Sequence, residues 1–186
     1  AQNSTAEVIE NTKETKAEKF LRESSLYRED TYIKLKEDGV TAYVKVATDL
    51  MTNKKIGYCY FETEADRATQ FFTGGNDGHP ESLGYLDMEQ IDDMILALNK
   101  IIEESKTKKE VKDFQIKYTT KSGINIHYGR AINGGSRVFY SKEWYYINQY
   151  GISRNITLTS PPASLQSLAK TVEMLEKAKK IINDNL

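Results

Sequence analysis

The sequence predicts an α+β fold in which about six to eight antiparallel strands form one curved sheet and two long helices lie on one face of it. Two observations lead to this prediction. Both halves of the chain carry segments in which apolar and polar residues alternate, as in half-buried strands. Both halves then close with a long amphipathic helix of matching apolar spacing. The shared order indicates an internal repeat, with residues 26–106 and 110–186 as its two copies.

Length and composition fit one small globular domain. The chain has 186 residues, of which 39% are hydrophobic and 28% are charged, as in ordinary globular proteins. One copy of the repeat alone would have a marginal core, so we expect residues 26–186 to form a single domain with a shared core. The 26 Lys and Arg residues against 27 Asp and Glu residues give a net charge of −1. This balance supplies no overall field for a nucleic acid, and we expect no nucleic-acid partner.

The first 25 residues are polar and predict a tether or a frayed helix, because their few large apolar residues cannot build a core. The sequence starts at Ala1 rather than at a methionine, which fits removal of a signal peptide or a trimmed start. We therefore expect a secreted or periplasmic protein. No apolar run reaches the ~18–20 residues that cross a bilayer, so no transmembrane segment is expected.

The strands of the first half form a predicted meander. Residues 32–36 and 40–46 alternate in polarity and are joined by Asp38-Gly39. This pair favours a tight hairpin because both residues tolerate positive φ. A polar turn over residues 52–55 leads into a third predicted strand over 56–62.

The alternation breaks after Glu64, where we expect a short strand over residues 68–72 and a glycine-rich loop over 74–81. The first long helix opens at Asp87, which fits a capping box with Gln90. Its apolar stripe indicates one buried face. The stripe consists of Met88, Ile91, Ile95, Leu98 and Ile102.

The second half follows the same order of strands and helix. Pro161 and Pro162 suit the approach to the closing helix, because proline fits the first helical turn and cannot continue a strand ladder. Strands are predicted over residues 114–118, 124–128, 137–141, 144–150 and 152–158. The closing helix carries Leu165, Leu168, Val172, Leu175 and Ile182 on its apolar face.

The repeated order of strands and helix resembles the pseudo-twofold, saddle-like folds of the TATA-binding-protein-like class. This resemblance is one of architecture, and it implies a sheet with one face left uncovered by the helices. A chain divided into two separate sheets is the alternative arrangement.

The most unusual local composition lies in the aromatic stretch of residues 139–150. Aromatic side chains interleaved with Asn, Gln and Lys can stack on sugars or form a protein-contact patch. The alternative is that alternate residues pack beneath the helices. RNA-binding proteins also use aromatic strands, but the basic surroundings that they need are absent here. The candidate binding residues are Tyr140, Trp144, Tyr145, Tyr146 and Tyr150.

The glycine-rich loop gathers Asp77, His79 and Glu81, which are residue types that bind metal ions. Their spacing matches neither a calcium loop nor a zinc site, so we expect a solvated loop and no metal or cofactor. Cys59 is expected to be a buried small hydrophobe. His127 alternates with apolar neighbours and is expected to face away from the core without a catalytic role.

These observations favour a non-enzymatic secreted or periplasmic binding or adaptor module. An exposed sheet face or the aromatic stretch would contact a protein, peptide or glycan. The alternative is a small metal-dependent or hydrolytic enzyme that uses the 74–81 loop together with His127 or with acidic residues that folding brings near it. The two halves differ in this loop and in the aromatic stretch, so a functional site is expected in one of these two places.

Overall fold

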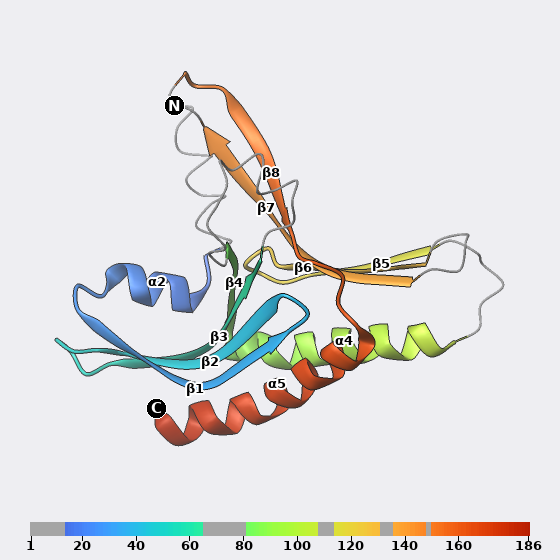
Figure 1. The fold of residues 1–186 in the computed structure, drawn as a ribbon. Coiled ribbons are helices and arrows are strands. Elements are labelled where there is room, and N and C mark those ends of the chain that lie inside the picture. The colour runs from blue at the N-terminus through green and yellow to red at the C-terminus, as the bar shows by residue number, and fades with distance from the viewer. Residues whose placement is uncertain (1–13, 65–80, 108–113, 131–135, 148–149) are drawn as a thin grey trace.

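The computed structural model is an α+β structure with two four-stranded antiparallel sheets and three α-helices in its described part (Figure 1). It describes residues 14–64, 81–107, 114–130, 136–147 and 150–186, with the backbone alone at 145–147 and 153–156. In chain order the elements are α2 (Lys16–Glu23), β1 (Tyr27–Glu37), β2 (Val40–Asp49), β3 (Lys55–Thr63), β4 (Glu81–Asp87), the 3-10 turn η1 (Met88–Gln90), α4 (Ile91–Lys106), β5 (Phe114–Thr119), β6 (Asn125–Arg130), β7 (Ser136–Ile147), β8 (Ser153–Thr159) and α5 (Leu165–Asn185).

The strands form two meanders. Sheet A has the order β1-β2-β3-β4 and sheet B has the order β5-β6-β7-β8. The predicted α+β class is therefore confirmed, and each sheet is followed by a long helix. A duplication of the sequence and a saddle-like shape stay predictions.

The predicted single curved sheet is wrong, and the alternative of two sheets holds. Sheet B meets β4 through side chains rather than through a backbone ladder. A Cβ atom on Gly84 would lie 3.1 Å from Ser122 Oγ and 3.2 Å from Ile124 Cγ1. After β4 the chain turns directly into η1 and α4, and among the described strands β4 pairs only with β3.

The hairpin between β1 and β2 forms where Asp38-Gly39 predicts it. Asp38 has φ 50° and Gly39 has φ 78°, and the flanking pair is Glu37 with Val40. The same turn holds the start of α5, because Asp38 Oδ2 accepts a hydrogen bond of 2.9 Å from the Ser164 N–H. Sheet A is thus tied to the closing helix of the second half.

The sequence pattern misses two parts of sheet A. β1 begins five residues before the predicted start, at Tyr27, and its pairing with β2 is irregular between Thr31 and Ile33. β4 was not predicted, because Gly84 has φ 136° and the β3–β4 register shifts between Phe61 and Glu62. A bulged strand does not show regular alternation. The predicted short strand over residues 68–72 lies outside the described residues.

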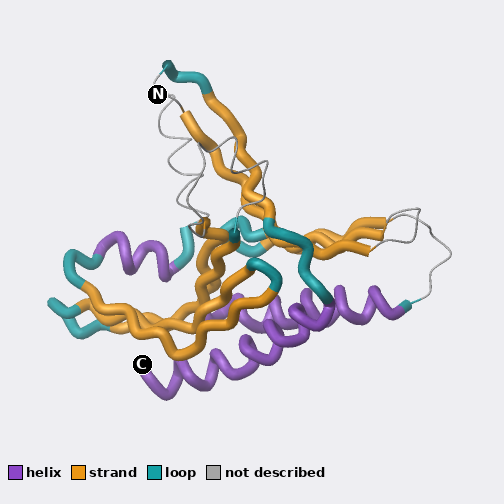
Figure 2. Tube along the Cα trace, viewed as in Figure 1, coloured by secondary structure: helices purple, strands orange, loops and turns teal. Residues whose placement is uncertain are grey.

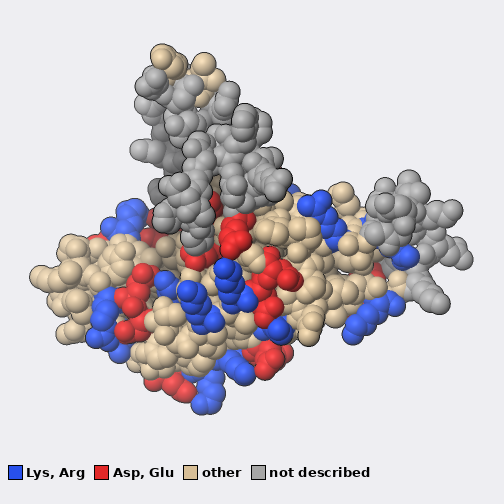
Figure 3. Space-filling view, in the orientation of Figure 1, with Lys and Arg blue, Asp and Glu red and all other residues tan. Residues whose placement is uncertain are grey.

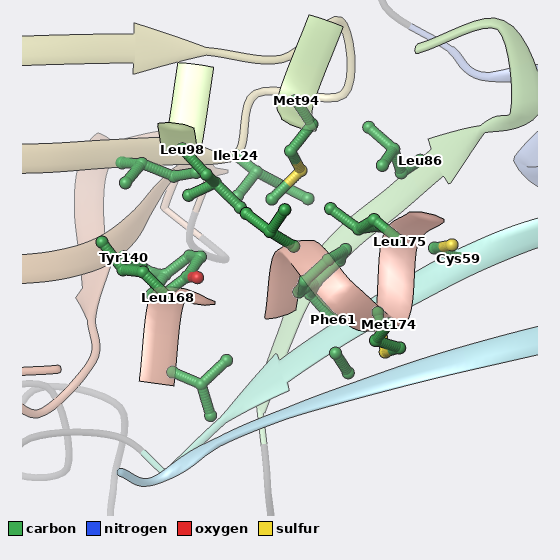
Figure 4. Packing of buried hydrophobic residues seen from close by; sticks show 14 of the residues in the cluster. Cys59, Phe61, Leu86, Met94, Leu98, Ile124, Tyr140, Leu168, Met174 and Leu175 are labelled. Atoms are coloured by element: carbon green, nitrogen blue, oxygen red, sulfur yellow. The ribbon is translucent and has the colours of Figure 1, made fainter. Parts of the chain in front are cut away.

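One hydrophobic core joins both sheets to α4 and α5. Figure 4 shows Leu98 of α4 and Leu168 of α5 converging with side chains from both sheets. The rings of Phe61 from sheet A and Tyr140 from sheet B stack with their centroids 6.4 Å apart. The shared core expected from the length of the chain is therefore present.

The helix α2 covers the other face of sheet A. Thr15 and Glu18 form a capping box at its start, and the buried Ala17 packs in a small cluster with Ala47 and Tyr58. Residues Lys16–Glu23 thus form a capped, packed helix within the segment for which a tether or a frayed helix is predicted. The capping box is visible in the sequence, whereas the contact with the sheet is not. Residues 1–13 lie outside the described part.

One buried carboxylate fixes the start of two helices. Asp87 forms the predicted capping box with Gln90, and its N–H donates to Gln90 Oε1 at 3.2 Å. The same side chain accepts from the N–H of Lys16 at 2.7 Å and of Ala17 at 3.0 Å. Since the first N–H groups of a helix lack partners within it, Asp87 holds α2 against the sheet.

Candidate functional site

Half of β7 leaves the body of the molecule. β7 pairs with β6 only from Ser136 to Ser141, and with β8 from Ser141 to Ile147. We call residues 142–147 and 150–158 the β7–β8 arm. Within the described residues, the two strands of this arm pair only with each other beyond Ser141. Figure 2 shows the two strands of the arm extending away from the described helices and from the other described strands.

Hydrogen bonds at the base of the arm hold it to the body. The Ser160 N–H donates to the Tyr140 C=O, and the Tyr140 N–H donates to Ser160 Oγ, both at 2.8 Å. On β7, Lys142 Nζ donates to the C=O of Ser122 at 3.0 Å. An isolated two-stranded hairpin is marginally stable in water, so these contacts at its base are what orient the arm.

Trp144 lies on the arm with its ring partly open to solvent. Its exposed fraction is 43%, and Lys142 Nζ lies 4.6 Å from the centroid of the ring. Burial lowers the pKa of the Lys142 ammonium, an effect that the carboxylate of Glu18 partly offsets. The cation–π contact restrains the indole ring while leaving part of it available for a partner.

The exposed apolar surface continues at the tip of the arm. Tyr150 is 77% exposed and Ile152 is 58% exposed. Sequence reasoning found Trp144 and Tyr150 but missed Ile152 and the cation of Lys142. The only signal for Ile152 was its position as the first residue of a predicted strand.

The structure removes Tyr140 from the predicted binding residues. Its side chain is 2% exposed and belongs to the shared core, and burial raises the pKa of its phenol to about 12. An interior residue cannot contribute to a contact patch. Tyr145 and Tyr146 lie on the arm opposite Asn155 and Arg154, and their role in binding stays a prediction.

His127 lies on the outer face of sheet B, away from the core, as predicted. Its ring stacks on Phe139 with centroids 4.6 Å apart, and Nε2 lies 3.0 Å from Ser141 Oγ. Desolvation and the nearby Lys117 lower the pKa of the imidazole, against a smaller opposite effect of Glu143. Ser141 is 3% exposed, so its hydroxyl is not open to attack a substrate and the pair serves packing.

The remaining candidate residues are Cys59 and the glycine-rich loop. Cys59 is fully buried, as predicted, and burial raises the pKa of its thiol to about 12. Asp77 and His79 lie outside the described residues, whereas Glu81 begins β4. Within residues 14–64, 81–107, 114–130, 136–147 and 150–186, no group of three or more His, Cys, Asp and Glu side chains is placed to hold a metal ion. The enzymatic alternative stays a prediction.

Sheet A carries an aromatic row that sequence reasoning missed. Tyr43, Tyr60 and Tyr85 lie opposite one another on three neighbouring strands, with ring centroids 5.9 and 4.9 Å apart. Lys45 Nζ lies 4.9 Å from the Tyr43 centroid, and Tyr85 packs on the cluster beneath α2. These rings therefore contact one another, and Tyr60 and Tyr85 also pack against the cluster beneath α2.

Charge does not single out a further site on the visible face. Figure 3 shows acidic and basic residues interspersed over that face, in agreement with the net charge of −1. No helix in the described part of the chain is long and apolar enough to cross a membrane. Comparisons with protein-family models, with curated proteins and with solved structures give no match to this chain.

Proposed function

We propose that the protein is a non-enzymatic binding module that contacts a protein or peptide partner through the β7–β8 arm. One observation carries this proposal: the arm projects from the body with Trp144, Tyr150 and Ile152 exposed along it. Aromatic residues are enriched at the centres of protein interfaces and supply much of their binding free energy. The secreted or periplasmic location stays a prediction.

The base of the arm supports a contact role in a second way. The hydrogen bonds of Ser160 and Lys142 fix the direction of the arm before a partner arrives. The contact of Lys142 with the ring of Trp144 restrains that side chain as well. Binding free energy is lost when loops and side chains must be ordered on association. A partner that binds this arm would meet a surface that is already ordered, so less binding free energy would be lost to ordering.

The test compares two exposed aromatic residues on different sheets. Trp144→Ala removes a ring that is 43% exposed on the arm, and Tyr32→Ala removes one that is 44% exposed on β1. The full-length protein and both variants are applied to immobilised panels of peptides and glycans. We expect the Trp144 variant to lose about tenfold in affinity, or about 1.4 kcal/mol, and the Tyr32 variant to bind as the unchanged protein does.

Two results would overturn the proposal. Binding that is unchanged in the Trp144 variant places the contact elsewhere. Binding to glycans alone, with no peptide retained, replaces the protein or peptide partner with a carbohydrate.

A further inference from the structure

The backbone of the arm has one edge that no described strand occupies. β6 reaches β7 only as far as the pair of Asn125 with Ser141. Beyond this pair, residues 142–147 continue with β8 on one side. The edge on which β6 lies is therefore left without a strand partner in the described part of the chain.

Hydrogen bonds at the base show which residues face that edge. Both backbone groups of Tyr140 bond to Ser160, and the C=O of Val138 accepts from the Ala163 N–H at 2.7 Å. These two even-numbered residues thus point toward the side of β8. Consecutive residues of a strand direct their backbone groups to opposite edges, and β7 pairs with β8 without a shift of register. The N–H and C=O groups of Glu143, Tyr145 and Ile147 consequently point to the open edge.

The open edge of the arm differs from the other long edge strand, β1. Charged residues and bulges are the usual protection of an edge against pairing with another chain. β1 has both, with an irregularity between Thr31 and Ile33 and six charged residues along its length, namely Arg28, Glu29, Asp30, Lys34, Lys36 and Glu37. In the arm, residues 144–147 are Trp, Tyr, Tyr and Ile, which favour strand pairing.

We propose that the open edge of the β7–β8 arm binds an extended peptide segment of a partner protein as an added antiparallel β-strand. This inference rests on the proposed binding function and specifies how the arm would bind its partner. Addition of a strand uses main-chain hydrogen bonds for affinity and alternate side chains for specificity. The backbone groups of Glu143, Tyr145 and Ile147 supply the hydrogen bonds.

Two neighbouring side chains of the arm define which peptide fits. Trp144 and Glu143 are both exposed, and consecutive residues of a strand lie on opposite faces. An apolar side chain of the added strand would lie beside the Trp144 ring, and a basic one beside the Glu143 carboxylate, as in favourable cross-strand pairs. The preferred partner segment therefore alternates apolar and basic residues.

The test uses a capped heptapeptide of alternating lysine and valine as the probe. Trp144 is the single tryptophan of the chain, so its fluorescence reports binding to the full-length protein. In the proposed register the lysine residues lie opposite Glu143 and Tyr145 and exchange both hydrogen bonds with them. We expect N-methylation of the lysine amides to weaken binding at least tenfold, and N-methylation of the valine amides to change it less than about twofold.

A variant of the protein gives the reciprocal test. Tyr145→Pro removes an N–H that points to the open edge and keeps the hydrogen bonds to β8, since proline is tolerated at such edge positions. We expect this variant to bind the probe at least tenfold more weakly, and Tyr145→Phe to bind it unchanged. If circular dichroism shows that Tyr145→Pro disturbs the fold, binding of the N-methylated peptides to the unchanged protein decides whether the probe adds as a strand.

The outcomes separate this inference from the proposed function. If the panel ligands need Trp144 but neither N-methylation nor Tyr145→Pro weakens the probe, the arm binds through side chains alone and the added strand is wrong. Failure of the probe to bind also overturns the added strand. Amide protection of Tyr145 that rises with protein concentration in the absence of peptide would assign the edge to a second copy of the chain, against the proposal.

Discussion

Sheets A and B have the same order of strands but differ in the lengths of those strands. The strands of sheet A have 11, 10, 9 and 7 residues, and each pairs along most of its length. Those of sheet B have 6, 6, 12 and 7 residues, so β7 extends well beyond β6. The same layout thus gives a filled sheet in the first half and a projecting arm in the second.

The outer faces of the two sheets differ in the same way. α2 packs on sheet A and covers a cluster that includes Tyr58 and Ala47, and Asp87 anchors it there. No helix of the described part covers the outer face of sheet B, where His127 and Phe139 stack on each other. Under the proposed function, sheet A is the scaffold and the arm of sheet B is the element that contacts a partner. The following predictions test this division, from the largest expected effect to the smallest.

The largest effect is expected at a glycine of sheet A. Gly57 of β3 lies against α5, and a Cβ atom there would come within 2.9 Å of Ile182 Cγ1 and closer still to its Cγ2. Gly57→Ala should lower the free energy of unfolding by about 3 kcal/mol, because overpacking in a core is costly. Urea denaturation measures this change.

Gly129 of sheet B is the matched control for Gly57. The nearest atom to a Cβ there is the Phe114 carbonyl oxygen at 3.7 Å, an ordinary contact. Gly129→Ala should be neutral, or stabilising by up to about 1 kcal/mol through the unfolded state. Equal losses in both variants would mean that the two sheets are packed alike.

The next effect concerns the helix that covers sheet A. Asp87→Ala leaves the N–H groups of Lys16 and Ala17 without their acceptor. We expect a loss of about 2 kcal/mol, since removal of an N-cap side chain typically costs about 1 kcal/mol and this residue serves two helices. Hydrogen exchange should quicken across α2, and unchanged exchange there would show that Asp87 does not hold the helix in place.

A smaller effect is expected where sheet A meets α5. The Ser164 N–H lowers the pKa of the Asp38 carboxyl by donating a hydrogen bond to it. A carboxyl whose pKa is lowered in the folded state stabilises the protein above the unfolded pKa, and this stabilisation is lost as the pH falls through the folded pKa. Asp38→Asn keeps a residue suited to the turn and should cost less than about 1 kcal/mol at pH 7.

The pH dependence supplies the control for Asp38. The difference in unfolding free energy between Asp38→Asn and the unchanged protein should shrink as the pH falls from about 4, the ordinary pKa of an aspartate, through the lowered pKa of Asp38 in the folded state. A difference that is constant between pH 7 and pH 2.5 would show that the charge of Asp38 contributes nothing.

The smallest effect on stability is expected on the arm. Trp144 is 43% exposed, so Trp144→Ala should lower the unfolding free energy by less than about 1 kcal/mol, whereas Leu98→Ala in the shared core should cost about 3 kcal/mol. Thermal unfolding of the two variants measures both. A large loss for Trp144 would indicate a structural role and weaken its assignment to binding.

Local signals in the sequence predicted the local structure well. Asp38-Gly39 fixed a hairpin because few residue pairs tolerate two positive φ values. Asp87 and Gln90 fixed the start of a helix because a capping box depends on residues only three apart. Such features are decided within a few residues and can therefore be recognised without the fold.

Features that depend on distant contacts escaped prediction. The anchoring of α2 joins Ala17 to Asp87, 70 residues away, and no local pattern encodes it. Tyr140 and Trp144 fall on the same face of β7 by alternation, yet Tyr140 is buried and Trp144 is exposed. The two side chains differ in burial because β6 ends opposite Ser141, so Tyr140 has a neighbouring strand beside it and Trp144 does not have β6 beside it. The sequence of β7 does not reveal where this neighbouring strand ends.

The most direct test of the division between scaffold and contact element removes the arm. In this variant Glu143 is joined to Thr157, the residue opposite it on β8, by an Asn-Gly turn. Thermal unfolding and panel binding are then measured on the same preparation. The account predicts that the variant folds, with a Tm within a few degrees of that of the unchanged protein. It also predicts that the variant no longer binds the panel peptides that the unchanged protein binds. Binding that survives removal of the arm, or a body that unfolds without it, would contradict the account.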